Sequence, residues 1–587
     1  MGKRIAFIGL DGAHPGTIKR LAKEGRLPNI SALADTGCSG LLKTTNASQS
    51  PVAWSTFQTG CNPGKHGIFD FIIRNPKTMQ LDIGLANERI DEQGNSHYSR
   101  KIRMPSVWHY LEKKNLRSIS LFIPVTFPPD KLCGIQVSGM APPDLRGTQG
   151  LPTLYTTDKI EAEKEDRVLL QYSERIETQI TGPKEQKIPF TVKPLKKSIE
   201  IEVQGKKFFL KKGEWGEWLE LSFNEKKGMA RFKLLERNGE RIKLYLSPVM
   251  RSQLNPDIPI TNPGKLAAEI MNECGCYKPL SFESDVHGFK EEMIDDNTWL
   301  EDMRYTFEQR IKTAKYLLEN NKWDFFSIDL FPVDRVQHMF WRFVDKKHPL
   351  FEESEYAGVI DETYELADKR IGELIEAIGD ATIFFISDHG FASYRRAVEL
   401  NKILLEEGFL KMKEGKTGNF MQIDWAKTEA YALGFSSVYL NRKGREKYGV
   451  VSEKDAPCIL ENISFALKKF SFDGEKPFAG ARKASELYSL EAGDLPDIIP
   501  IYNEGFRSAK ASAIGAVSEK EILHDNLNKW SGDHIGPFED STLPGIIYCN
   551  NGFNLKDAGI IDLAPTALDF FGIRAPKEMD GKSLMGE

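Results

Sequence analysis

The chain lacks any long hydrophobic run, and its cysteines are few and scattered. No apolar stretch in the 587 residues approaches the roughly 20 residues that span a bilayer. The apolar run before Asp11 is too short for the core of a signal peptide and is better interpreted as a first strand. Of the seven cysteines only Cys274 and Cys276 lie close together, a pattern that predicts reduced thiols. We therefore expect a cytoplasmic protein that does not associate with membranes.

The charge balance also lacks a strong excess of either sign. A net charge of −5 at pH 7 argues against nucleic-acid polymers as the main partner. A local basic pocket for a small anionic substrate is compatible with this charge. The chain has no internal repeat and no low-complexity tract, and its length predicts two or three structural units. Nothing in the sequence indicates the oligomeric state.

Five short apolar runs predict buried parallel strands, at residues 4–10, 118–123, 323–328, 382–387 and 545–549. Apolar residues at helical spacing over 297–320 and 354–378 predict helices between some of these strands. Continuous apolar strands that alternate with helices are typical of an α/β fold. We therefore expect a mostly parallel sheet sandwiched by helices.

The middle of the chain has a different pattern. Short alternating segments at 198–203, 206–210, 219–223 and 230–235, separated by charged turns with glycine, predict antiparallel strands. We expect a β-rich inserted domain at 150–260 and a discontinuous core formed by 1–145 and 265–587. Within that core, residues from about 395 to 540 show no clear strand pattern and are expected to form an irregular excursion.

Acidic residues and histidines follow three of the predicted strands. Asp11 ends the first strand, Asp388 and His389 follow the strand TIFFIS, and Asp334 and His338 come soon after the strand WDFFSI. Because ligands in open α/β sheets bind beyond the carboxyl ends of the strands, these side chains are candidates for one site.

Each of these signals has an ordinary structural alternative. Asp334 and His338 are spaced to bind one ion from a single helix face, but a surface pair has the same spacing. Asp388 and His389 could share an ion only in a bent backbone, which Gly390 would permit, and a plain turn with an exposed imidazole is the alternative. His534, in the loop SGDHIGP, is a lone histidine, which more often has no ligand role.

Ser50 opens a predicted helix, PVAWSTFQTG, with Ser50 as its N-cap, Pro51 at the first helical position and Gly60 near its end. A cap alone would explain the serine. The unpaired N–H groups and positive potential of a helix N-terminus would also favour an alkoxide and a bound phosphate at Ser50. The spacing does not distinguish these two interpretations.

Taken together and in order, these segments resemble the type I phosphodiesterase/nucleotide pyrophosphatase family of the alkaline phosphatase superfamily. The resemblance is carried by the strand ending in Asp11, S-P-V-A-W-S-T-F-Q-T-G-C-N-P-G-K-H-G-I at 50–68, D-x-x-x-H at 334–338, S-D-H-G-F at 387–391 and the loop that holds His534. The closing segment, IIDLAPTALDFFGI followed by MDGKSL, is similar to that of the superfamily. The resemblance covers roughly 1–145, 300–400 and 528–587, and implies an alkaline-phosphatase-like fold with the β-rich middle as an addition.

The resemblance also implies a site. One metal ion would be bound by Asp334, His338 and His534, and a second by Asp11, Asp388 and His389, with Ser50 touching the second ion as the catalytic nucleophile. The family's metal is usually zinc, and ligands of oxygen and nitrogen would also accept manganese. No other cofactor is expected. The implied activity is two-metal hydrolysis of phosphodiester or phosphoanhydride bonds in a small phosphorylated substrate, through a covalent phospho-Ser50 intermediate.

The chain departs from the family pattern in two places. Ser50 stands where nucleotide pyrophosphatases often have threonine, a mild chemical change. Phe71 stands where they commonly have an asparagine that holds a phosphate oxygen, which puts nucleotide preference in doubt; Arg74 or Lys43 are candidate substitutes as donors. His66 is expected to support the helix rather than bind metal.

Three other functions are weighed against the leading one. A sulfatase is disfavoured because Ser50-Pro51-Val52 lacks the C/S-x-P-x-R pattern. A phosphomonoesterase or phosphomutase would share the same ligands. A catalytically inactive relative that binds a phosphorylated ligand is the alternative outside enzymes, and the complete set of candidate ligands argues against it.

Overall fold

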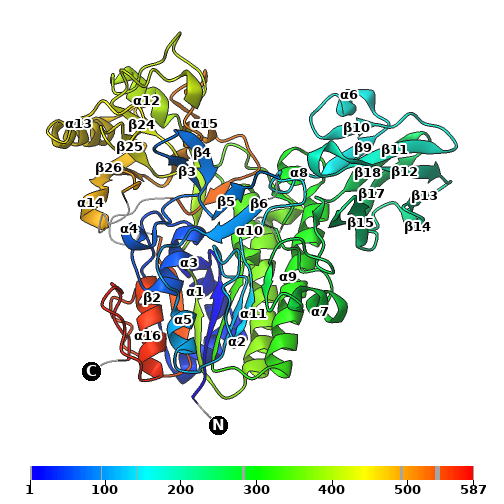
Figure 1. The fold of residues 1–587 in the computed structure, drawn as a ribbon, viewed down its shortest axis with the longest axis horizontal. Helices are drawn as coiled ribbons and strands as arrows, with labels where there is room; N and C mark the ends of the chain where they lie inside the picture. The colour runs from blue at the N-terminus through cyan, green and yellow to red at the C-terminus, as the bar shows by residue number, and fades with distance from the viewer. Residues whose placement is uncertain are drawn as a thin grey trace. The chain divides into compact units, whose positions relative to one another are not determined.

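The structure, a computed structural model, describes residues 3–93, 96–140, 142–280, 284–488, 493–535 and 543–585. Contacts between residues divide the chain into two units. The first is formed by Met1–Val125 together with Lys322–Glu587, and the second by Thr126–Asn321. Figure 1 shows the elements of both units along the chain.

A mixed sheet lies at the centre of the first unit, and its strands there have the order β2-β31-β22-β1-β21-β7. Strands β22, β1, β21 and β7 are parallel. Their bounds are β1 Ile5–Leu10, β2 Cys38–Leu42, β7 Ser118–Leu121, β21 Phe325–Leu330, β22 Thr382–Ile386 and β31 Gly545–Cys549. Every residue of β1 and β21 is buried, as expected for strands covered on both faces.

The prediction of a parallel strand at 545–549 is wrong. Strand β31 is present at those residues, but it runs antiparallel to both of its neighbours, β22 and β2. A continuous apolar run shows that a strand is buried on both faces but carries no information about its direction. The direction depends on how the preceding segment reaches the sheet.

Two groups of helices pack in the first unit. Helix α11 contacts α1, α2 and α10, whereas α16 contacts α3 and α5. The bounds are α1 Pro15–Lys23, α2 Pro28–Thr36, α3 Ser50–Thr59, α4 Pro63–His66, α5 Val107–Glu112, α10 Pro332–Phe340, α11 Val359–Ile378 and α16 Leu563–Phe570, with two hairpins, β3 Ile72–Asn75 with β4 Gln80–Ile83, and β5 Ala86–Ile90 with β6 Ser96–Arg100. The helix expected at 354–378 is thus α11 preceded by the short 3-10 helix η3, Glu355–Gly358.

Two small sheets occupy the stretch that showed no strand pattern. One has the order β24-β25-β27-β26, and in the other β23 pairs with β28, β29 and β30. Their strands are β23 Ala392–Val398, β24 Ala430–Ala432, β25 Val438–Leu440, β26 Phe478–Lys483, β27 Ile498–Tyr502, β28 Gly505–Ser508, β29 Leu523–Asp525 and β30 Gly532–Asp533, and the helices are α12 Leu400–Glu406, α13 Ala456–Lys469, α14 Ala484–Leu487 and α15 Lys510–Ala513. Apart from β23 and β26, these strands are too short to show a clear period of two. The expected excursion also includes residues 489–492 and 536–540, which lie outside the described residues.

The second unit is rich in antiparallel strands. Strands β12 Lys187–Pro194 and β13 Ser198–Val203 alternate buried and exposed positions, so one face of their sheet packs on an apolar core. The remaining strands are β8 Ile135–Val137, β9 Thr153–Thr156, β10 Arg167–Leu169, β11 Ile176–Thr181, β14 Lys206–Lys211, β15 Leu219–Phe223, β16 Lys226–Ala230, β17 Phe232–Asn238, β18 Arg241–Leu246, β19 Met250–Arg251 and β20 Thr261–Asn262, and the helices are α6 Lys159–Ala162, α7 Leu266–Glu273, α8 Val286–Lys290 and α9 Asp296–Asn320.

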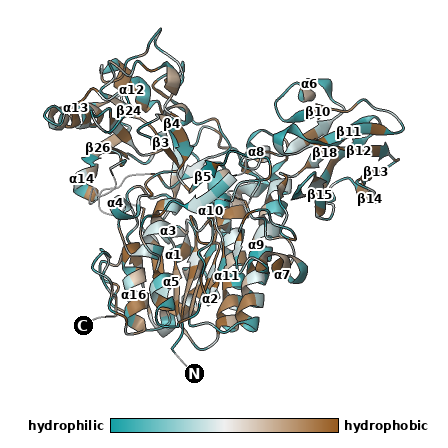
Figure 2. Ribbon diagram, in the orientation of Figure 1, coloured by the Kyte–Doolittle hydropathy of each residue, from teal (hydrophilic) through white to brown (hydrophobic). Residues whose placement is uncertain are grey.

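Hydropathy follows these two patterns. In Figure 2 the strands of the central sheet are largely brown, whereas the strands of the second unit mix brown and teal. The strands expected at 198–203 and 219–223 have the predicted bounds, and that expected at 230–235 begins two residues later, in β17. Whether residues 150–260 form a separate domain stays a prediction. Among the described residues, no helix combines the length and the apolar character needed to cross a bilayer.

Arg74, which the sequence offered as a phosphate donor, lies in a buried ion pair. Its Nη2 is 2.5 Å from Glu446 Oε1, and neither side chain is exposed. Its Nε donates to the Tyr431 hydroxyl at 2.6 Å, and its guanidinium lies 3.8 Å from the centre of the Tyr439 ring. Lys43, the other candidate, is half exposed and pairs with Asp557 at 3.1 Å.

These two cations predict very different effects on stability. Arg74→Met removes a buried donor to Glu446 and Tyr431 and should lower the free energy of unfolding by about 1–3 kcal/mol. The loss is limited to this range because Glu446 keeps its pair with Arg445 at 2.8 Å. Lys43→Met removes an exposed ion pair and should change it by less than about 1 kcal/mol. Urea unfolding followed by tryptophan fluorescence measures both. Equal losses in the two variants would contradict this account of Arg74.

Candidate metal centre

Three neighbouring parallel strands bring carboxylates to one edge of the sheet. Asp11 follows β1, Asp334 lies in the first turn of α10 directly after β21, and Asp388 follows β22. Since β22, β1 and β21 are adjacent and parallel, their carboxyl ends meet. The glycine after Asp11 makes the approach possible, because a Cβ at Gly12, whose φ is +67°, would lie 3.0 Å from Asp334 Oδ1.

The turn after β22 also depends on a close approach. A Cβ at Gly390 would lie 2.9 Å from the carbonyl oxygen of Pro544, so a side chain there would displace the backbone. Ser387 fastens the same turn: its hydroxyl donates to the carbonyl of His389 at 2.7 Å and accepts the N–H of Ala13 at 2.8 Å. The turn that holds Asp388 and His389 is therefore tied to the end of β1.

Ser50 occupies the first position of α3 rather than its N-cap, which is Gln49. The predicted cap is thus one residue off, and the N–H groups of Val52 and Ala53 bond to the Gln49 carbonyl. The Ser50 hydroxyl instead donates to Asp11 Oδ1 at 3.2 Å and lies 3.3 Å from His389 Nε2. Its side chain therefore faces the carboxylates, at a helix N-terminus whose potential favours anions.

Trp54 is a residue of this site that the sequence did not single out. Its indole Nε1 donates to Asp11 Oδ2 at 3.0 Å, which leaves Oδ1 facing Ser50. The ring lies so close to β1 that a Cβ at Gly9 would be 2.2 Å from it. Trp54 is one helical turn after Ser50, so the i, i+4 spacing was the available signal.

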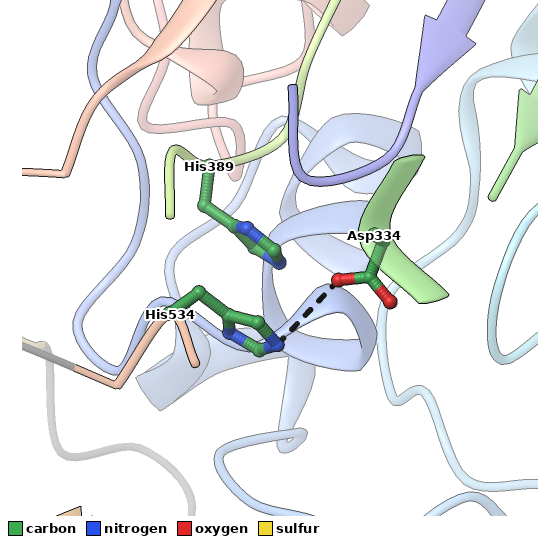
Figure 3. A group of neighbouring side chains, drawn as sticks. All are labelled: Asp334, His389 and His534. Atoms are coloured by element: carbon green, nitrogen blue, oxygen red, sulfur yellow. Dashed lines mark ion pairs between the residues drawn. The ribbon is translucent and has the colours of Figure 1, made fainter. Parts of the chain in front are cut away.

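The predicted ligands lie together in two overlapping groups. Ligand atoms of Asp11, Asp388 and His389 lie within 4.8 Å of one another, and so do those of Asp334, His389 and His534. His338 Nε2 lies 3.4 Å from Asp334 Oδ1, and His534 Nε2 lies 3.9 Å from the same oxygen. Figure 3 shows His389 and His534 stacked, with both rings directed toward Asp334. The structure thus places His389 between the two groups that the resemblance implied.

The three imidazoles share one hydrogen-bonding pattern. Nδ1 donates to a backbone carbonyl in each case: His338 to Gly532 at 2.7 Å, His389 to Gly390 at 3.0 Å and His534 to Ser48 at 2.5 Å. With Nδ1 protonated, each neutral ring carries its lone pair on Nε2, the atom that faces the carboxylates. Histidines that bind metal ions are commonly oriented in this way.

The electrostatics of the site fit bound cations. Burial raises the pKa of Asp11 well above its usual value, and the nearby Asp388 and Asp334 raise it further. Burial likewise raises the pKa of Asp388. Asp334 Oδ1 and Asp388 Oδ2 are buried oxygens without a hydrogen-bond donor among the described residues. Carboxylate oxygens and unprotonated imidazole nitrogens are suitable ligands for zinc or manganese, so the residues present fit a divalent metal centre.

His66 lies outside both groups. Its Nε2 bonds to the Thr56 hydroxyl at 2.9 Å, and its Nδ1 accepts the N–H of Ile68 at 3.1 Å. Burial lowers the pKa of His66 to about 3. The imidazole is therefore neutral, with both nitrogens used to join α3 to the turn after α4.

Comparison with known protein families identifies the family of the chain. Residues 5–190 and 253–527 match the model of the type I phosphodiesterase/nucleotide pyrophosphatase family. The protein is thus a hydrolytic enzyme of the alkaline phosphatase superfamily, with the corresponding α/β fold. Within that superfamily the chain belongs to the type I phosphodiesterase/nucleotide pyrophosphatase family. The unmatched residues 191–252 lie in the β-rich stretch, and His534 lies beyond the matched ranges.

Two solved structures are similar at low identity. Phosphonoacetate hydrolase from Sinorhizobium meliloti 1021, in complex with phosphonoformate, is 13% identical over 97% of this chain and 95% of that one, with a TM-score of 0.45. Human ectonucleotide pyrophosphatase/phosphodiesterase 5 is 10% identical over 99% of this chain and 97% of that one, with a TM-score of 0.46. No curated protein sequence matches the chain.

Removing one side chain from each group should lower the metal content. We expect Asp388→Asn and His338→Ala each to lower the affinity for one metal ion by more than about a hundredfold. Even residues that only orient a ligand change metal affinity by 10–100-fold. His66→Gln is the matched control and should retain the full metal content. Elemental analysis after dialysis against limiting Zn²⁺ measures all three. Unchanged stoichiometry in both ligand variants would contradict the assignment.

Proposed function

We propose that the enzyme cleaves phosphodiester or phosphoanhydride bonds by a two-metal mechanism with a covalent phospho-Ser50 intermediate. The position of the Ser50 hydroxyl carries this proposal. It lies 3.2 Å from Asp11 Oδ1 and 3.3 Å from His389 Nε2, at the N-terminus of α3 and beside both groups of candidate ligands. A serine that served only as a helix cap would have its hydroxyl on backbone N–H groups.

Each group of candidate ligands would bind one metal ion. Asp11, Asp388 and His389 would bind the ion beside Ser50, and Asp334, His338 and His534 would bind the other. When bound, two divalent ions lower the pKa of a neighbouring hydroxyl and offset the charge on the oxygens of a transferring phosphoryl group. Zinc is the metal proposed, and manganese is the alternative that this ligand set also accepts.

The residues of the chain position the reaction. Trp54 holds Asp11, and the turn fastened by Ser387 holds His389, so the Ser50 oxygen is fixed between two side chains. The buried N-terminus of α3 supplies positive potential at Ser50, which favours a phosphate there, although the N–H groups of Val52 and Ala53 already bond to the Gln49 carbonyl. The fixed position of the Ser50 oxygen relative to the bound phosphate thus supplies much of the expected rate increase.

The proposed reaction has two steps, formation and hydrolysis of the covalent intermediate. Ser50 Oγ loses its proton to solvent and forms a bond to phosphorus, while the bond from phosphorus to the leaving oxygen breaks and the leaving alcohol or phosphate takes up a proton. Water then attacks the same phosphorus, the bond to Ser50 Oγ breaks, and the serine hydroxyl regains a proton. The net reaction is hydrolysis of one phosphoester or phosphoanhydride bond.

Ser50→Ala tests the nucleophile directly. Turnover of bis-p-nitrophenyl phosphate should fall by at least about a thousandfold, because the variant has no oxygen to form the intermediate. Metal content should be retained, since three side chains remain for each ion. A quenched wild-type reaction should show the Ser50 peptide carrying a p-nitrophenyl phosphoryl group in its mass spectrum.

Ser55→Ala is the matched control. Ser55 is buried in the same helix, and its hydroxyl has no hydrogen-bond partner among the described residues. This variant should keep turnover within about threefold of the wild type. Equal turnover in wild type and Ser50→Ala would refute the proposed nucleophile.

The choice between diester and monoester follows from a paired assay. We expect a higher kcat/KM for bis-p-nitrophenyl phosphate than for p-nitrophenyl phosphate. The reverse order would identify a phosphomonoesterase or phosphomutase with the same ligands. Absence of activity on both, with metal bound, would favour the inactive relative that binds a phosphorylated ligand.

A further inference from the structure

Asp533, the residue before His534, accepts three hydrogen bonds and forms one ion pair although it is almost fully buried. Oδ1 accepts the N–H groups of His534 and Ile535, at 2.8 and 3.0 Å. Oδ2 accepts the indole N–H of Trp530 at 2.9 Å and lies 2.6 Å from Arg507 Nη1. Both carboxylate oxygens of Asp533 therefore bond to other groups of the protein. Asp533 is thus not itself a candidate metal ligand, although it is adjacent to His534.

The loop that Asp533 organises touches both histidines of one candidate group. It contributes His534 itself, whose Nδ1 bonds to Ser48. It also supplies the Gly532 carbonyl that accepts Nδ1 of His338 at 2.7 Å. The indole of Trp530 lies against the His338 ring, with ring centres 3.7 Å apart. One carboxylate thus joins the segments that fix the orientation of two imidazoles.

The same loop is fastened to α10 by its backbone. The N–H of Ser531 donates to the carbonyl of His338 at 2.6 Å. A Cβ at Gly532 would lie 2.6 Å from the carbonyl of Gln337, so the two backbones pack directly on each other. A shift of the loop would therefore move both His534 and the ring environment of His338.

Arg507, on β28, holds the carboxylate from the other side. Its guanidinium packs over the rings of Phe435 and Tyr394, at 4.2 and 5.3 Å from their centres. This packing limits the movement of the arginine. The ion pair joins β28 to the metal-site loop although Arg507 has no ligand role of its own.

We propose that Asp533 and Arg507 are positioning residues that orient His338 and His534 and so raise the metal affinity of the group containing Asp334, His338 and His534. The inference deepens the proposed function and rests on it. The group of Asp11, Asp388 and His389 has no hydrogen bond to Asp533 among the described residues, so the effect should be confined to one ion.

Two substitutions test the pair. In Asp533→Asn the new amide N–H groups would meet the donors of Arg507 or Trp530, so the loop must move although the side-chain volume is kept. Arg507→Met leaves the buried carboxylate without its cation. Arg507→Lys retains the charge and should restore most of the affinity. Asp525→Asn, which removes the half-exposed partner of Arg396 at 2.5 Å, is the matched control.

The experiment measures one ion at a time by Co²⁺ titration, with visible absorption reporting the ligand geometry. In an Asp388→Asn background, where the group with His338 and His534 holds the remaining ion, Asp533→Asn and Arg507→Met should raise the dissociation constant about 10–100-fold and change the Co²⁺ spectrum. In a His338→Ala background, the same two substitutions should leave the affinity of the other ion unchanged. That second result also shows that the variants fold.

The outcomes separate this inference from the proposed function. A wild-type protein that binds no Co²⁺ would refute the metal centre, and the positioning role with it. A wild type that binds two ions, with Asp533→Asn and Arg507→Met unchanged in the Asp388→Asn background, would overturn the positioning role and leave the function standing. An equal loss of affinity for both ions, or a similar loss of affinity in Asp525→Asn, would show a general structural effect. Either result would also overturn the positioning role.

Discussion

Three carboxylates buried beside three imidazoles are the constraint on which the first unit depends. Asp11, Asp334 and Asp388 follow the ends of adjacent parallel strands, so their charges converge at one edge of the sheet. Such a cluster is unfavourable in a low-dielectric interior without cations: the pKa values of Asp11 and Asp388 are raised, whereas His338 and the Arg335 guanidinium lower the pKa of Asp334. The surrounding residues form contacts that keep these groups in place despite their repulsion.

Those devices are close backbone approaches and hydrogen bonds to side chains outside the ligand set. Gly9 and Gly12 allow Trp54 and Asp334 to pack against the end of β1, where a side chain would collide. Backbone carbonyls hold each Nδ1, so the histidines present Nε2 without a choice of tautomer. The strands behind this edge are buried throughout and mostly apolar, with Ser327 and Asp329 as the polar residues of β21.

Much of this could be predicted from the sequence because local patterns carry it. Short, continuous apolar runs identified the central strands, and the residues directly after them identified Asp11, Asp388 and His389 as candidates. The antiparallel direction of β31 could not be predicted, since burial on both faces looks the same in either direction. The strands between 392 and 533 are mostly too short to show alternation. Arg507 gave no signal either, because its contact with Asp533 exists only in the folded chain.

The position of Ser50 in the structure separates two interpretations of this serine, a helix cap and a nucleophile. Serine before proline is what a helix cap predicts, and the sequence alone favoured neither interpretation. In the structure the helix starts at Ser50, and the carbonyl of Gln49 accepts the first N–H groups. The hydroxyl is therefore released from capping and bonds to Asp11. A side chain that stabilises neither the helix nor an apolar core, yet is held between a carboxylate and an imidazole, is explained better by chemistry at phosphorus than by folding.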